Sequence, residues 1–225
     1  PWEFRSKPAW QRLIIMVGGV VVNIILAIVI FVGITWYWGD EQLPVKNLKY
    51  GVHVDSLGKS IGLKDGDNVI AMDGKKIENF GSIESELVLT EAKKLTVLRE
   101  GQTIEIDVPE SFMQKIVEQK KFSGMLMPQY PVIVDSVSST AVFNSGELKK
   151  GDRLIAMNGK AFTYYHEFDQ LKKSAANTVA QLTAIRGVDT VQIKALVNDK
   201  GAIGFFQLSP LAILGTEHIQ YDLLA

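Results

Sequence analysis

The run of residues that comes nearest to catalytic chemistry is His166-Glu167-Phe168-Asp169-Gln170. A zinc protease of the H-E-x-x-H type needs two histidines on one helical face, with the glutamate between them as the base. Gln170 stands where the second histidine would be, so we interpret this run as a chance partial match. His53 and His218 are distant in the sequence and predict no ligand cluster.

Other catalytic signatures do not stand out in the sequence either. It has no G-x-S-x-G elbow and no glycine-rich phosphate loop. Cysteine is absent, which excludes disulfides and thiolate metal sites. The 24 basic and 25 acidic residues give a net charge of -1, so no global field would attract nucleic acid. We expect no nucleic-acid partner, no bound metal and no activity from this chain alone; because it begins with Pro1, adjoining sequence is expected to hold the chemistry.

One segment, residues 13–38, is long, apolar and uncharged, and it predicts a transmembrane helix. It exceeds the apolar region of a signal peptide, and it lacks the polar face of a soluble helix. The aromatic residues that end it are typical of a membrane interface. Basic residues precede the segment and acidic residues follow it, so the preceding flank, 1–12, should stay in the cytoplasm and the rest should be extracytoplasmic. The flanking residues are Arg5, Lys7 and Arg12 on one side, and Asp40 and Glu41 on the other.

Asn23 is the strongly polar side chain well inside this segment, and Gly19 lies one turn before it. A glycine at that spacing lets another helix approach closely, while the Asn23 amide can form a hydrogen bond across the interface between the two helices. Simple helix packing and a role beside an active site are both consistent with this pair.

Two copies of one pattern fill residues 48–208. The segment 66–75 recurs as 151–160 with seven of ten positions identical, at an offset of 85. The triplet Val-Asp-Ser at 54–56 recurs at 134–136, and the segment 122–126 is echoed by 202–206, each at an offset of 80. We call residues 48–128 repeat 1 and residues 129–208 repeat 2.

Each repeat predicts the same order of elements: a strand, a short helical turn, a strand, a helix and a hairpin. The first two strands are predicted at 52–54 and 69–72 in repeat 1, and at 132–134 and 154–157 in repeat 2. The pairs Asp73-Gly74 and Asn158-Gly159 should close the second strand in tight turns, because these residues tolerate a positive φ. The hairpins are predicted at 95–108 and 179–196.

This order, with the Gly-Asp-x-φ-Ile/Leu-x-φ-Asx-Gly segment in each repeat, resembles the PDZ domains of bacterial proteases. In the circularly permuted kind, the strand beside the peptide groove comes last. The resemblance implies one transmembrane α-helix followed by two α+β, mainly β, circularly permuted PDZ-like domains. Plain core packing is the alternative for the residues that match the groove strand. They are Ser123, Gly124, Met125, Leu126 and Met127 in repeat 1, and Ile203, Gly204, Phe205 and Phe206 in repeat 2.

A membrane span about ten residues before two such repeats resembles the site-2 proteases, specifically intramembrane zinc metalloproteases of the regulator-of-sigma-E type. The Gly-x-x-x-Asn motif of that family is matched by Gly19 and Asn23, and its entry to this helix resembles the segment 7–12. The resemblance implies zinc in the full-length enzyme, held by an H-E-x-x-H helix and an L-D-G aspartate. Met72-Asp73-Gly74 imitates the latter, but its counterpart has Asn158, which favours a structural role.

The resemblance also implies a location and partners. It predicts a multi-pass protein of the bacterial inner membrane with the PDZ pair in the periplasm. The partners would be the lipid bilayer and single-span membrane substrates whose extracytoplasmic part has been removed, with the PDZ pair binding peptide or acting as a steric filter. The predicted ranges are a flank at 1–12, a span at 13–38, a linker at 39–47, PDZ-like domains at 48–128 and 129–208, and the start of a segment leading to a further membrane region at 209–225.

Two other functions fit parts of the sequence. A membrane-anchored adaptor without protease activity would use the PDZ pair to recruit extracytoplasmic chain ends. A periplasmic serine protease with two PDZ domains would need a catalytic domain between the span and repeat 1, where only 39–47 lies. An H-E-x-x-H motif about one helix upstream would favour the enzyme over the adaptor.

Overall fold

The computed structural model describes residues 8–119 and 123–221. The chain divides into two compact units, one that joins the residues up to Gln42 with those from Glu217 onward, and one that spans Leu43–Thr216. Arg5 and Lys7 of the predicted basic flank lie outside the described residues, as does Phe122 of the second sequence echo.

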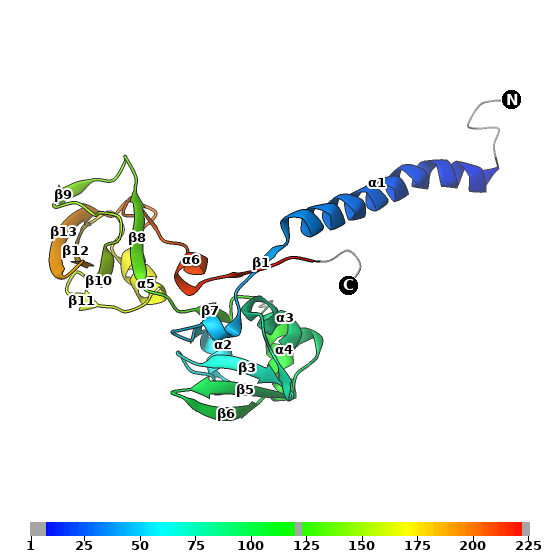
Figure 1. The fold of residues 1–225 in the computed structure, drawn as a ribbon, viewed down its shortest axis with the longest axis horizontal. Helices are drawn as coiled ribbons and strands as arrows, with labels where there is room; N and C mark the ends of the chain where they lie inside the picture. The colour runs from blue at the N-terminus through cyan, green and yellow to red at the C-terminus, as the bar shows by residue number, and fades with distance from the viewer. Residues whose placement is uncertain (1–7, 120–122, 222–225) are drawn as a thin grey trace. The chain divides into compact units, whose positions relative to one another are not determined.

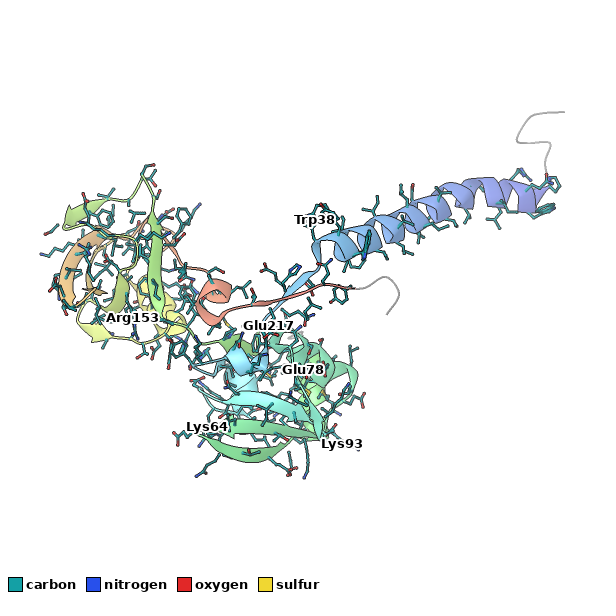
Figure 2. All side chains as sticks on the ribbon, in the orientation of Figure 1. Trp38, Lys64, Glu78, Lys93, Arg153 and Glu217 are labelled. Carbon is teal, nitrogen blue, oxygen red and sulfur yellow. The ribbon has the colours of Figure 1, made fainter. Side chains whose placement is uncertain are left out.

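The first unit is dominated by α1, Ala9–Trp38. At about 1.5 Å per residue its 30 residues extend about 45 Å, and by length and composition they are able to cross a bilayer. Figure 2 shows side chains projecting all around this helix, with Trp38 at its end. The predicted apolar helix is therefore confirmed, and it begins four residues earlier than the uncharged segment.

Two short strands also belong to the described part of the first unit. After α1, β1 (Asp40–Gln42) pairs antiparallel with β15 (Glu217–Ile219), and Gln42 lies directly opposite Glu217 (Figure 1). Gly39 joins α1 to β1 with φ +65°, and a Cβ there would lie 2.5 Å from the Ile219 carbonyl oxygen. Both the backbone angle and the close approach therefore require glycine at this junction.

Repeat 1 lies within the second unit and contains a curled sheet with strand order β4-β3-β5-β6, while β2 pairs separately with β7 (Figure 1). The hairpin predicted at 95–108 is confirmed by the antiparallel pairing of β5 with β6, and Glu100 and Gly101 both have positive φ in its turn. The short helix η2, Val45–Asn47, precedes repeat 1. The elements of repeat 1 are β2 Val52–Val54, α2 Ser56–Lys59, β3 Asn68–Met72, β4 Lys75–Lys76, η3 Phe80–Ser82, α3 Ile83–Leu89, β5 Lys94–Arg99, β6 Gln102–Asp107, α4 Glu110–Glu118 and β7 Leu126–Pro128.

The core of repeat 1 collects the apolar faces of these elements into one cluster. In α3, Ile83 and Leu87 lie four residues apart on one helical face, and both are buried. The cluster also takes in Leu43, Val45 and Leu214, which lie in the sequence ranges outside repeat 1. Each such side chain contributes about 1.5–3 kcal/mol when fully buried. The linker and the segment after repeat 2 thus help to stabilise repeat 1.

The sequence analysis missed α4. Its buried residues Phe112 and Ile116 are one turn apart, and Pro109 lies at its N-cap, where the missing amide hydrogen has no helical partner to lose. Both signals are present in the sequence. In repeat 2 the corresponding connection, from the end of the hairpin to β14, is formed by turns over residues 197–204.

Repeat 2 forms a larger sheet with strand order β14-β8-β10-β12-β13-β9, and β11 pairs with β10. Its core is a second, separate cluster that includes Phe168, Leu154 and Leu182. The elements are β8 Val132–Val137, β9 Phe143–Ser145, β10 Arg153–Met157, β11 Lys160–Ala161, α5 Tyr165–Ser174, β12 Val179–Arg186, β13 Asp189–Leu196 and β14 Phe205–Gln207; α6 Pro210–Leu214 follows.

The prediction of a short helical turn in both repeats holds only in repeat 1, where it is α2. In repeat 2 the chain turns at Ser138, whose carbonyl oxygen accepts from the Ala141 amide, and then forms the strand β9. This strand pairs with β13, so Ser145 lies opposite Lys194. Pairing with a free sheet edge satisfies the backbone groups of this segment and replaces the helical turn.

The backbone hydrogen bonds correct one sequence correspondence. The Val134 amide donates to the Asp152 carbonyl oxygen at 2.9 Å, and the Val52 amide donates to the Asp67 carbonyl oxygen at 2.9 Å. Val134 therefore corresponds to Val52, an offset of 82, and the match of Val54 with Val134 is not a structural one.

Candidate functional site

The residues predicted to form a groove strand lie in or beside β7 and β14, and burial separates them into two groups. The buried members are Met125, Leu126 and Ile203, which belong to the cores of their repeats. Phe205 is half-buried, and its ring contacts that of Phe168 on α5 with 6.1 Å between the centroids. These four side chains therefore act in core packing.

The other predicted groove residues are accessible. Met127 is 42% exposed and Phe206 is 64% exposed. Gly124 and Gly204 share a left-handed backbone, with φ +82° and +85°. In repeat 2 a Cβ at Gly204 would also lie 2.7 Å from the Cβ of Ala141, so this loop is closely packed. Ser123 is exposed at the start of the described segment.

A carboxylate that the sequence did not single out contacts the loop in repeat 1. Glu84, on α3, accepts from the Gly124 amide through Oε2 at 2.7 Å and from the Leu126 amide through Oε1 at 2.6 Å. No motif in the sequence marks Glu84, because the two contacts span 40 and 42 residues. Backbone amides that converge on one carboxylate form an anion site.

The Gly-Asp pair that defines the repeat has a structural role. Asp67 and Asp152 are fully buried, and each accepts two hydrogen bonds from one guanidinium group. In repeat 2, Nε and Nη2 of Arg186 lie 2.8 and 2.7 Å from Oδ1 and Oδ2 of Asp152. Burial acts to raise the pKa of Asp152, but the hydrogen bonds from Arg186 and from the Lys149 amide outweigh it and lower that pKa.

The corresponding pair in repeat 1 has the same geometry. Nε and Nη2 of Arg99 lie 2.7 and 2.8 Å from Oδ1 and Oδ2 of Asp67. The Arg99 Nη2 atom also donates to the Gly62 carbonyl oxygen at 2.8 Å. The sequence contained the signal for these pairs, since each hairpin has an arginine at the end of its first strand. Only the folded register shows that this arginine reaches the buried aspartate.

Asp73 and Asn158 occupy the tight turns predicted for them, with φ +45° and +49°. Oδ1 of Asp73 accepts from the Lys94 amide at 2.8 Å, and Oδ1 of Asn158 accepts from the Gln181 amide at 2.8 Å. Asp73 also accepts from the Lys93 amide, which lies 3.0 Å from Oδ1 and 3.2 Å from Oδ2. The contact that the two turns share needs only one side-chain oxygen, so an amide can make it in place of a carboxylate. Within residues 8–119 and 123–221, no group of three or more His, Cys, Asp or Glu side chains fits a metal ion.

Two of the three histidines lie together, contrary to the scattered arrangement expected from the sequence. The rings of His53 on β2 and His166 on α5 stack with 3.9 Å between centroids and 13° between planes. Burial lowers the pKa of His166, the electrostatic interaction with His53 acts in the same direction, and Glu167 and Asp65 oppose this shift. His218 lies in β15, where Nε2 is 3.3 Å from Oε1 of Gln220.

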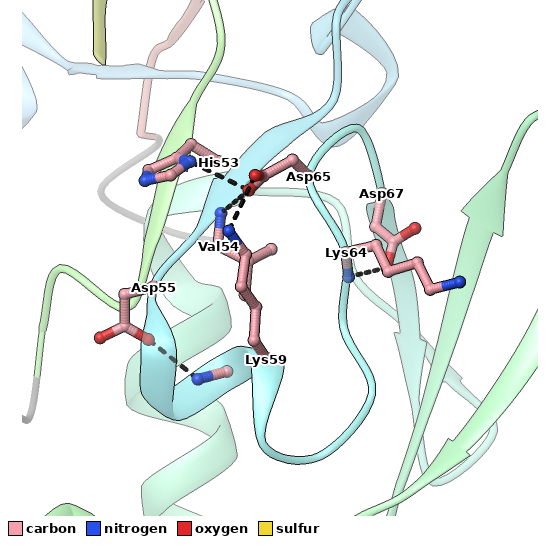
Figure 3. Close-up of polar contacts among 8 residues, drawn as sticks. His53, Val54, Asp55, Lys59, Lys64, Asp65 and Asp67 are labelled. Carbon is pink, nitrogen blue, oxygen red and sulfur yellow. Dashed lines mark hydrogen bonds and ion pairs between the residues drawn. The ribbon is translucent and has the colours of Figure 1, made fainter. Parts of the chain in front are cut away.

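Asp65 contacts His53, the member of this pair on β2, and also the Val54 backbone and Lys59 (Figure 3). Its Oδ1 accepts from the Val54 amide at 2.7 Å and lies 2.9 Å from Nδ1 of His53, while Oδ2 accepts from Lys59 Nζ at 2.8 Å. Burial acts to raise the pKa of Asp65, and the bonds from Lys59 and Val54 more than offset it, so the net shift is downward. These charged contacts stabilise the position of β2, the strand that pairs with β7.

The pair Gly19 and Asn23 lies on α1, where both residues are exposed. The Gly19 backbone has open space around it, since an added Cβ would find no atom within 4 Å. Four residues of separation place the two on one face of the helix. This face is accessible to a neighbouring helix.

The sequence matches the family described as Peptidase family M50 over residues 1–220, which include α1 and both repeats. The chain belongs to peptidase family M50, the site-2 proteases. Among curated relatives, it is 26% identical over 199 residues to a Neisseria meningitidis protein named "Putative zinc metalloprotease", covering 84% of this chain and 44% of that protein. It is 26% identical over 204 residues to the regulator of sigma-W protease RasP of Bacillus subtilis, covering 83% of this chain and 47% of RasP.

This M50 chain corresponds to only part of each of these relatives. It spans less than half the length of each of these two relatives. The Neisseria relative is named as a zinc metalloprotease and RasP as a protease, whereas the described residues of this chain contain no group of three or more His, Cys, Asp or Glu side chains that fits a metal ion.

Proposed function

We propose that this chain is part of an intramembrane zinc metalloprotease that cleaves membrane-spanning substrates, and that the two repeats are extracytoplasmic PDZ-like domains that control which substrates reach the active site. The observation that carries the proposal is the family match, which covers residues 1–220 and so includes α1 and both repeats. A membrane helix and two repeats in this order are expected of a protease segment that receives substrates outside the cytoplasm.

The attachment of the repeats supports a controlling role. The chain leaves α1 through β1 and comes back through β15, and these two strands pair with Gln42 opposite Glu217. The second unit, Leu43–Thr216, is therefore inserted between two adjacent points of the first unit. An insertion of this kind is able to control access to the membrane unit without contributing catalytic groups.

The same geometry supplies a clean test in the full-length protein. Because Gln42 and Glu217 are direct partners, residues 43–216 can be replaced by Asn-Gly, which closes an antiparallel pair as a two-residue hairpin. The assay compares cleavage of two single-span substrates, one with a bulky extracytoplasmic domain and one without it. Membrane accumulation of each variant is measured in parallel.

We expect the intact protease to cleave only the truncated substrate. If the repeats act as a filter, the deletion variant cleaves the bulky substrate as well. If they recognise substrate, the deletion variant accumulates normally but loses cleavage of the truncated substrate. Unchanged cleavage of both substrates would refute a controlling role.

The orientation of the repeats is tested separately. The described basic residue before the apolar part of α1 is Arg12, and acidic residues follow in β1, so we place the repeats outside the cytoplasm. A reporter that works only in the cytoplasm, fused after Leu208, should be inactive. Activity of that reporter would overturn this orientation.

A further inference from the structure

The anion site of repeat 1 is built from the outer edge of β7. The inner edge pairs with β2, with Val54 opposite Leu126, and the Met125 carbonyl oxygen accepts from the Asp55 amide. Backbone groups alternate between the two edges of a strand, so the amides of Gly124 and Leu126 lie on the edge away from β2. Both donate to Glu84.

This edge has no further donor within β7. The next residue in the alternation is Pro128, which has no amide hydrogen. A peptide that adds to a sheet edge gains its affinity from backbone hydrogen bonds, and a terminal carboxylate binds to convergent backbone amides. While Glu84 is bound, its carboxylate takes both donors that such a peptide would need.

The acidic side chain at the corresponding helix position of repeat 2 makes different contacts. The offset of 85 relates Glu84 to Asp169, and the preceding residues Ile83 and Phe168 are both 1% exposed. The Asp169 side chain is one methylene shorter, and it pairs with Lys172 at 3.0 Å and Lys173 at 2.6 Å on its own helix. Its carboxylate is thus held along α5, whereas the Glu84 carboxylate is held on the loop.

We propose that Glu84 occupies the place of a chain-terminal carboxylate and keeps repeat 1 closed to chain ends, so that repeat 1 binds a free α-carboxylate only when Glu84 withdraws. This inference rests on the proposed function, because it assumes that the repeats bind extracytoplasmic chain ends. It assigns different roles to the two repeats. In repeat 1 the Glu84 carboxylate competes with a chain end for the loop amides, whereas in repeat 2 the corresponding Asp169 carboxylate pairs with lysines of its own helix.

The size of the effect follows from the population of the open state. The apparent dissociation constant equals the intrinsic one divided by the open fraction. If Glu84 is bound in at least about nine molecules in ten, its removal tightens peptide binding by about tenfold or more. An amidated peptide has no terminal charge to replace that of Glu84, so its binding should tighten little when Glu84 is removed.

The test uses the full 225-residue chain in detergent micelles. The variants are Glu84→Ala and Glu84→Gln, and Glu86→Ala is the matched control because it removes the same charge from the same helix. The probe is a fluorescein-labelled hexapeptide, Gly-Ser-Gly-Val-Ala-Leu, with either a free or an amidated carboxyl terminus. Fluorescence anisotropy measures binding, and the ¹⁵N-glycine spectrum reports the Gly124 amide during titration with acetate.

We expect Glu84→Ala to bind the free-acid peptide about tenfold or more tightly than the unmodified chain, with a smaller gain for Glu84→Gln and none for Glu86→Ala. Acetate should move the Gly124 amide resonance saturably in Glu84→Ala but not in the unmodified chain. Equal peptide affinity in Glu84→Ala and the unmodified chain would refute the proposal, as would an unresponsive Gly124 resonance. Because these readouts involve no cleavage, they are independent of the substrate test above.

Discussion

Replacement of Arg186 by Met should destabilise repeat 2 because it removes the partner of a buried carboxylate. Asp152 is fully buried, and Arg186 donates two hydrogen bonds to it and a third, at 2.7 Å, to the Glu147 carbonyl oxygen. After the substitution, the Lys149 amide at 2.8 Å is the contact that Asp152 keeps. Arg186→Met retains most of the apolar stem, so the loss is mainly electrostatic.

The expected magnitude follows from the burial of the two partners. Breaking a buried pair by removing one partner costs about 3–5 kcal/mol. The Arg186 side chain is 33% exposed, so water can partly replace it, and we expect a value near the lower limit, about 3 kcal/mol. At about 1.4 kcal/mol per factor of ten, the open fraction of repeat 2 should rise about 150-fold.

Hydrogen exchange followed by mass spectrometry is the suitable assay. All four tryptophans lie in residues 2–38, so tryptophan fluorescence would not report on either repeat. Peptides from β10 and β12 should exchange about 150-fold faster in Arg186→Met, while peptides from β5 and β6 serve as an internal reference. The control is Arg153→Met, which removes an exposed arginine of the same sheet and should change stability by less than about 0.5 kcal/mol.

The pH dependence checks the physical cause. In the unmodified chain the pKa of Asp152 is lowered from 3.8, so the pair stabilises the fold fully above pH 3.8 and loses this contribution as the pH falls below it. Without Arg186, burial should raise the pKa of Asp152, and acidification from pH 7 should then reduce the difference between variant and unmodified chain. An Arg186→Met chain that exchanges no faster than Arg153→Met would refute the reasoning.

The remaining predictions concern the histidine pair, the membrane helix and the metal. The lowered pKa of His166 implies a contribution to stability that is complete above pH 6.5 and is lost as the pH falls from 6.5 through the lower folded value. Urea titrations between pH 7.5 and 5 should therefore show a smaller loss of unfolding free energy for His166→Gln than for the unmodified chain. Equal losses with pH in the two chains would exclude His166 as the cause. Asn23→Leu in the full-length protein removes a hydrogen bond worth about 0.6 to 2 kcal/mol but makes the span more apolar, so we expect normal membrane accumulation. Cleavage of a single-span substrate should be slower, by up to about a hundredfold if a displacement near 1 Å results. Unchanged cleavage would reduce Asn23 to helix packing, and lost accumulation would show a role in assembly. Residues 43–216, which include the buried Leu43, Val45 and Leu214, should be soluble and should bind no stoichiometric zinc; one tightly held zinc per chain in elemental analysis would contradict the roles given to Asp73 and His166.

The sequence by itself determined the features that depend on local pattern. The uncharged apolar run specified α1, because backbone groups in a bilayer must be satisfied within the segment. The repeated Gly-Asp segment located β3 and β10, and the Asx-Gly pairs located the turns at Asp73 and Asn158 through their tolerance of positive φ. The order of these patterns was also enough to indicate the protease family.

The tertiary structure decided the features that depend on distant partners. The Glu84 contacts, the Asp152 to Arg186 pair and the stack of His53 on His166 each join residues more than 30 positions apart, and no periodicity encodes such distances. The same holds for β9, which forms a strand because the edge of β13 offers it backbone partners. Local spacing sets which element a residue joins, but the register of the folded chain sets which charge, amide or ring it meets.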